Sequence, residues 1–150
     1  MANINATIEV DRPVRTVYNQ WTQFEQFPRF MEGIEEVKQR SDDTLSFTAE
    51  IAGVERRWDA RIVEQEPDRV IAWTSIGGVR NNGRVTFEEL GPDSTKVNLE
   101  LDVDPEGFVE KAGDSLGLIE GRAKGDLERF RDFIEERPRE TGAWRGEIHD

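Results

Sequence analysis

A long series of short alternating segments constrains the fold of this chain more than any other feature. Within residues 34–103, apolar and polar residues alternate with a period of two, which indicates strands that bury one face. Gly, Pro, Asp and Ser residues separate the segments and are typical of turns. Short strands joined by such turns predict an antiparallel meander. The expected strands are 34–40, 45–51, 54–64, 70–76, 83–90 and 95–103.

The residues before this series predict one more strand and two short helices. Residues 4–10 alternate in the same way and would add a seventh strand. Asp11 can cap a helix, and Pro13 is tolerated in a first turn because the amide hydrogen that it lacks would have no partner there. We therefore expect a helix over 12–21, followed by a Phe-rich helical turn that Pro28 separates from a loop.

One long helical pattern follows the strands. Pro105 ends the predicted sheet, and apolar residues then recur at spacings of three and four over residues 106–137. This spacing predicts a single helix with one apolar stripe. Charged pairs at helical spacing, among them Asp126 with Arg129, are expected on its solvent-facing side. Pro138 would end the helix.

Four glycines interrupt this helical pattern. Gly113, Gly117, Gly121 and Gly125 recur every fourth residue, and each costs about 1 kcal/mol relative to Ala in a helix interior. A step of four drifts by about 40° per repeat, so the four glycines do not share one face. Two explanations stay open. In the first, the glycines make the helix pliable or break it near residues 113–117. In the second, they let a neighbouring backbone approach closely.

Composition excludes several classes of mechanism. The chain has no Cys and a single His, His149, so a Cys nucleophile, a Ser-His-Asp triad and a multi-histidine metal site lack their residues. The net charge of -12 opposes binding to nucleic acids and to anionic membranes. No apolar run approaches the roughly 20 residues that span a bilayer, and the N-terminal residues lack the pattern of a signal peptide. We expect a cytoplasmic protein, a monomer or a homodimer, with no metal, no cofactor, no nucleic-acid partner and no membrane insertion.

The chain divides into one domain, residues 1–137, and a polar C-terminal tail, residues 138–150. A terminus of this composition is disordered unless something anchors it. Trp144 is costly to leave in water, so we expect it to dock onto the domain or onto a second subunit. Arg145 is then expected to pair with an acidic surface residue, while residues 147–150, His149 included, are expected to be frayed.

Four stretches of the sequence resemble a known superfamily. They are VDRPVRTVYNQWTQFEQFPRFMEGIEEV, VIAWTSIGG, GRVTFEELGPDSTKVNLELDVDPEG and GDLERFRDFIEERPRETGAWRGEI. Together they are similar to the START-like (SRPBCC, Bet v 1-like) superfamily and to its bacterial polyketide cyclase/dehydrase-like branch. The resemblance implies an α+β helix-grip fold, in which a bent, seven-stranded antiparallel sheet wraps around a long C-terminal helix. Two short helices follow the first strand, and a cavity between sheet and helix takes an apolar ligand.

Strand alternation then selects the side chains that would face this helix. Arg56 shares the parity of Trp58, so it either stands at the cavity mouth, where it could hold a carboxylate or phenolate, or lies at a solvated strand end. An ordinary filled core needs the same apolar residues, so cavity and core both stay open. The residues expected to contact a ligand are Phe30, Phe47, Trp58, Trp73, Val85, Phe87, Leu99, Leu116, Ile119 and Arg56.

Two functions follow from this inventory. The favoured one is binding of a small hydrophobic molecule, such as a lipid, a polyketide or another aromatic metabolite. The alternative is a polyketide aromatase/cyclase or dehydratase-like enzyme, which needs a base within hydrogen-bond reach of its substrate. The predicted inward faces offer almost no polar groups, so no catalytic residue is assigned. A partner-binding domain with a collapsed cavity is a third possibility.

Overall fold

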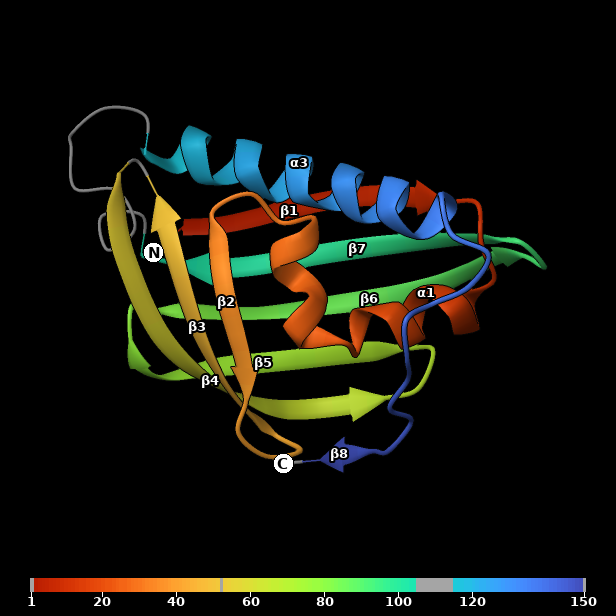
Figure 1. Cartoon of the computed structure of the whole chain (residues 1–150), viewed down its shortest axis with the longest axis horizontal. Helices are drawn as coiled ribbons and strands as arrows, with labels where there is room; N and C mark the ends of the chain where they lie inside the picture. The colour runs from red at the N-terminus through yellow and green to blue at the C-terminus, as the bar shows by residue number, and fades with distance from the viewer. Residues whose placement is uncertain (1, 52, 105–114, 150) are drawn as a thin grey trace.

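The computed structural model describes residues 2–51, 53–104 and 115–149. A curled antiparallel sheet wraps around a C-terminal helix (Figure 1), which confirms the predicted seven-stranded arrangement. Strands β2 to β7 are neighbours in chain order, and β1 pairs with β7. The strands are β1 (Ala2–Val10), β2 (Ile34–Gln39), β3 (Thr44–Ile51), β4 (Val54–Glu66), β5 (Val70–Gly78), β6 (Asn81–Gly91) and β7 (Ser94–Val103).

The two short helices lie where the sequence predicts them. Helix α1 (Val14–Trp21) begins directly after Pro13, and the 3-10 helix η1 (Phe24–Arg29) follows it. Pro28 lies inside η1 and does not end it, contrary to expectation. The last helix, α3, is described over Ser115–Glu135, and the first part of the predicted helix, residues 106–114, lies outside the described residues.

The apolar stripe of α3 is buried against the sheet. Its members are spaced by three or four residues, and none is more than 8% exposed. Burying a side chain of this size contributes about 1.5–3 kcal/mol, so tertiary packing outweighs the poor helix propensity of the glycines. The stripe consists of Ile119, Ala123, Leu127, Phe130 and Ile134.

Gly121 and Gly125 of α3 do not make room for a neighbouring backbone. A Cβ placed on Gly121 would meet nothing within 4 Å, and one placed on Gly125 would meet only the flexible guanidinium of Arg129. Close backbone approach therefore does not explain either residue. Gly113 lies outside the described residues, and a pliable first half of the helix remains a prediction.

The C-terminal tail covers polar residues of α1. Asn19, Gln20 and Thr22 are at most 3% exposed, although they are polar. Gln20 Nε2 donates to Thr141 Oγ1 at 3.0 Å, and the backbone amide of Thr141 donates to Gln20 Oε1 at 2.9 Å. The backbone amide of Trp144 donates to Thr22 Oγ1 at 3.1 Å. The tail thus supplies the partners that buried polar groups require.

The end of the tail is ordered by Arg145 and by a short strand. Arg145 forms the expected acidic pair, with Asp68 at 2.8 Å, and also donates to Asn19 Oδ1 at 2.6 Å. Beyond it, β8 (Ile148–His149) pairs with β4. The prediction that residues 147–150 are frayed is therefore wrong for Ile148 and His149, because β4 extends beyond the end of β3 and leaves an edge to pair with.

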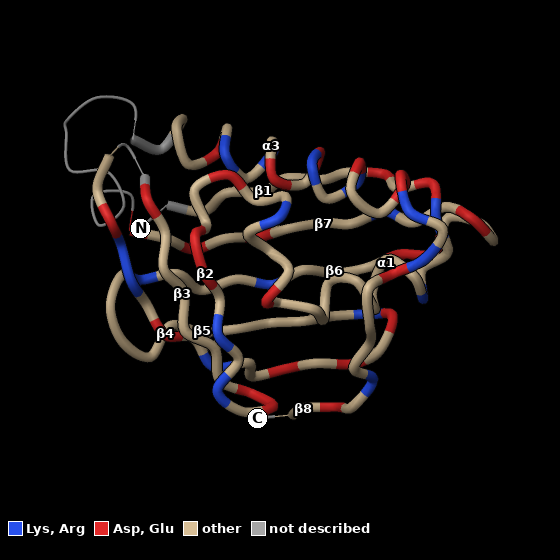
Figure 2. The backbone as a smooth tube through the Cα atoms, viewed as in Figure 1, with Lys and Arg blue, Asp and Glu red and all other residues tan. Residues whose placement is uncertain are grey.

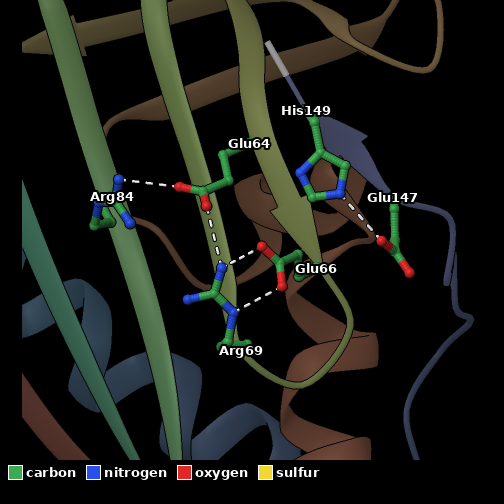
Figure 3. A network of polar contacts seen from close by, with 6 residues as sticks. All are labelled: Glu64, Glu66, Arg69, Arg84, Glu147 and His149. Atoms are coloured by element: carbon green, nitrogen blue, oxygen red, sulfur yellow. Dashed lines mark hydrogen bonds and ion pairs between the residues drawn. The ribbon is translucent and has the colours of Figure 1, made fainter.

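Charged residues are spread over the described chain. Figure 2 shows acidic and basic residues interleaved along α3 and along the strands of the sheet. Figure 3 shows one ionic network, in which Arg69 bridges Glu64 and Glu66 and Arg84 reaches Glu64 at 3.0 Å. His149 lies next to this network and contacts Glu147 at 3.1 Å. Such partly exposed pairs contribute little to stability.

Candidate functional site

A cavity of about 160 Å³ lies between the concave face of the sheet and α3. Its walls come from α1, η1, the loop after η1, strands β2 to β7 and α3. Most of the lining side chains are aromatic or aliphatic. The polar side chains in the lining are Glu32, Asn81, Arg122 and Asp126.

Five of the sequence-predicted residues line this cavity. Phe47 and Trp58 are partners across β3 and β4, and their rings stack with centroids 5.1 Å apart and planes 6° apart. Trp73 of β5 pairs with Gly83 of β6. A Cβ on Gly83 would lie 2.4 Å from the Trp73 ring, so only glycine leaves space for this indole. Leu99 and Ile119 complete the five.

Four other predicted residues, Phe30, Val85, Phe87 and Arg56, do not line the cavity. Phe30 packs on Phe130, with ring centroids 5.5 Å apart, and Phe87 packs edge to face on Tyr18 at 5.2 Å. These rings, with the fully buried Val85, fill one part of the interior. Arg56 pairs with Ala49 across the strands but is absent from the lining. The side chain of Leu116 lies outside the described part of the chain.

This difference has a simple packing cause. Parity along a strand decides which face a side chain occupies, and all the apolar predictions that the structure describes do point inward. Whether the inward space is filled depends on the neighbouring elements. Near Phe87 and Phe30, the rings of α1, η1 and α3 interlock, whereas the small Ala49 and Ala123 line the hollow part.

The loop that joins η1 to β2 closes one side of the cavity and is tied to α3. The backbone amide of Glu32 donates to Asp126 Oδ1 at 3.0 Å, and Arg129 Nε donates to the carbonyl of Phe30 at 2.9 Å. Arg122 Nη1 donates to the carbonyl of Glu32 at 3.2 Å. Gly33 has φ 88° and a Cβ there would lie 2.7 Å from Arg122, so this loop requires glycine.

Asp126 lines this side of the cavity and has a shifted pKa. It forms the expected i,i+3 pair with Arg129 at 2.6 Å, in which Asp126 lines the cavity and the Arg129 side chain is 39% exposed. Burial raises the pKa of Asp126 from 3.8 to about 6, because desolvation of the carboxylate outweighs the hydrogen bonds from Arg129 and Glu32 and the charge of Arg122.

Sequence reasoning missed the polar part of the lining. Asn81 precedes the expected strand 83–90, yet it has the parity of Val85 and Phe87, and extending the strand by two residues would have placed it inward. Asp126 has no such signal. It is half-buried because residues far away in the chain, in the loop after η1, fold over it.

Two kinds of site are not found in the part of the chain that the structure describes. No cluster of three or more His, Cys, Asp or Glu residues is arranged to hold a metal ion. Among the described helices, none combines the length and the apolar character needed to cross a membrane.

Comparisons with known proteins agree with this architecture. A Streptomyces lincolnensis protein, named "Uncharacterized 17.2 kDa protein in melC2-rnhH intergenic region", is 50% identical over 149 residues, which are 99% of each chain. The Zhui aromatase/cyclase from Streptomyces sp. R1128 has a similar structure, with a TM-score of 0.74 and 17% identity over 95% of this chain and 99% of that one.

A START superfamily protein from Mycobacterium smegmatis is also similar, with a TM-score of 0.68 and 20% identity over 90% of this chain and 95% of that one. At these identities the solved structures support the fold alone. The model of one protein family, described as "Polyketide cyclase / dehydrase and lipid transport", matches residues 10–132. The resemblance seen in the sequence is thereby confirmed, and the chain belongs to the polyketide cyclase/dehydrase and lipid transport family.

Proposed function

We propose that this protein binds a small hydrophobic molecule, with at least one aromatic ring, in the cavity between the sheet and α3. The observation that carries the proposal is the hollow, mostly apolar interior beside the stacked Phe47–Trp58 pair. Apolar walls with a few polar groups are typical of small-molecule sites. Membership of a family described by polyketide processing and lipid transport supports the same role. In this proposal Phe47, Trp58, Trp73, Leu99 and Ile119 contact the ligand.

The size of the cavity limits the ligand. Sites for drug-sized molecules usually measure about 300–1,000 Å³, whereas an apolar cavity of about 150 Å³ engineered into another protein takes up benzene. At about 160 Å³, this cavity accommodates one or two rings. A long acyl chain or an extended polyketide would require the loop at Glu32 to move away from α3.

Native mass spectrometry of freshly purified protein tests this proposal. We expect a non-covalent adduct of low mass, and we expect it to disappear in Ala123→Phe, because Ala123 lines the cavity and a ring there would fill it. Gly121→Ala is the matched control on the same helix, since Gly121 faces open space. An adduct that persists in Ala123→Phe would place the ligand elsewhere.

One observation favours the second candidate, a cyclase- or dehydratase-like enzyme. A carboxyl group whose pKa is about 6 can accept a proton near neutral pH, and Asp126 lies in the cavity lining. Asp126→Asn distinguishes the two candidates. An enzyme would convert its substrate and lose this turnover in Asp126→Asn while still binding the ligand, whereas a binding protein would bind the ligand without turnover in both forms.

A further inference from the structure

Asn81 offers a hydrogen-bond donor within the otherwise apolar part of the cavity. It is the first residue of β6, it is half-buried, and it lies opposite Val103 of β7. Val103, Leu101 and Trp73 line the cavity together with it. The charged groups of the lining come from α3 and from the loop after η1, whereas Asn81 comes from the sheet.

The contact with Trp73 sets the orientation of the Asn81 amide. Trp73 Nε1 lies 3.3 Å from Asn81 Oδ1. An indole nitrogen only donates, so the atom that faces it is the amide oxygen. The Asn81 NH₂ group is therefore turned away from Trp73, and among the described residues it has no hydrogen-bond acceptor.

The neighbouring Asn82 does not line the cavity. Its side chain belongs to the opposite face of β6, where Oδ1 accepts hydrogen bonds from Thr74 Oγ1 at 3.0 Å and from the backbone amide of Ser75 at 2.9 Å. Asn82 thus joins β5 to β6. Asn81 likewise accepts with its oxygen, but its NH₂ group lies at the cavity, where no described residue accepts a hydrogen bond from it.

We propose that Asn81 recognises a neutral oxygen acceptor, such as a ketone, ester or ether oxygen, on the aromatic ligand of this cavity. This inference rests on the ligand-binding function proposed above. An oxygen that enters an apolar cavity loses its hydrogen bonds to water, and one correctly placed donor compensates for that loss. A carboxylate is disfavoured here because a single neutral amide does not offset the cost of burying a charge.

Acetophenone and α-methylstyrene test the proposal, because they differ only by an oxygen in place of a CH₂ group. Their dissociation constants can be measured by NMR titration of the ¹⁵N-labelled protein. We expect the ketone to bind about 3- to 10-fold more tightly, the range that corresponds to one net hydrogen bond. The side-chain NH₂ signal of Asn81 is identified as the one that disappears in Asn81→Leu. In the unmodified protein, this signal should shift when the ketone is added and should not shift when the alkene is added.

Three variants complete the experiment. Asn81→Leu and Asn81→Asp both remove the donor, and the second keeps an acceptor for Trp73, so the preference for the ketone should fall to about 1-fold in each. Asn82→Asp is the matched control and should keep the full preference. Equal affinities of the two compounds for the unmodified protein would overturn the proposed role of Asn81 but not the proposed ligand binding. A preference for the ketone that survives in both Asn81 variants would do the same. Binding of neither compound to the unmodified protein would overturn the proposed function as well.

Discussion

At the scale of single residues, burial and neighbouring charges have opposite effects on the pKa of Asp126. Its pKa is raised to about 6 despite two hydrogen bonds and two neighbouring arginines. A raised pKa in the folded state means that the protonated carboxyl favours folding. This contribution is fully present below pH about 4 and is lost as the pH rises through 6. The ionised carboxylate is therefore a source of instability at neutral pH.

Asp126→Asn should remove this pH dependence. From pH 7.5 to pH 4.5, we expect the unfolding free energy of the unmodified protein to rise by roughly 2 kcal/mol relative to that of the variant. Urea denaturation at a series of pH values measures the difference. Parallel pH curves for the two proteins would show that Asp126 has its ordinary pKa in the folded state.

The same scale shows what the sequence could not reveal about the site. Alternation correctly placed Trp58, Trp73 and Phe47 on the inner face, because side-chain direction in a strand is a local property. The hollow around them is not local. It depends on how closely η1 and α3 approach the sheet, and for that reason Phe87 and Phe30 turn out to be filled core.

At the scale of elements, long periodic segments were predictable and the tail strand was not. Each strand of the meander carries its own alternation and its own turn residues, so local signals suffice. The strand β8 has only two residues, Ile148 and His149, and no period. It forms because Arg145 brings the tail to β4, which is a tertiary effect.

Arg145→Ala tests this account of the tail. The substitution leaves Asn19 and Asp68 without their charged partner, so we expect a loss of about 1–3 kcal/mol in unfolding free energy. Cleavage of the folded protein by trypsin after Arg139 should also become faster. Arg131→Ala is the control, because Arg131 pairs only with its exposed neighbour Asp132. Equal cleavage rates in the two variants would mean that Arg145 does not anchor the tail.

Gly121→Ala tests the helix that covers the cavity. Gly121 is helical and a Cβ there meets nothing within 4 Å, so the substitution should raise the unfolding free energy by about 1 kcal/mol. Thermal denaturation followed by circular dichroism measures the gain. A loss of stability would contradict the helical environment described for Gly121.

At the scale of the whole molecule, a charged exterior surrounds a partly empty interior. Charged groups are interleaved across the described surface, and the curled sheet closes on α3 without filling the space near Ala49 and Ala123. Empty apolar volume destabilises a fold, since its lining loses dispersion contacts. A ligand that restores those contacts would stabilise the protein, and the gain would grow with the logarithm of ligand concentration above the dissociation constant.

Tryptophan fluorescence tests the central claim, that the interior is an accessible ligand site. Trp58 and Trp73 line the cavity, so titration with a one- or two-ring aromatic quencher should reduce their emission with saturation at one ligand per chain. Ala123→Phe, with the cavity filled, should lose the saturable component. Linear, non-saturating quenching that is the same in both proteins would show that the cavity does not take up a ligand.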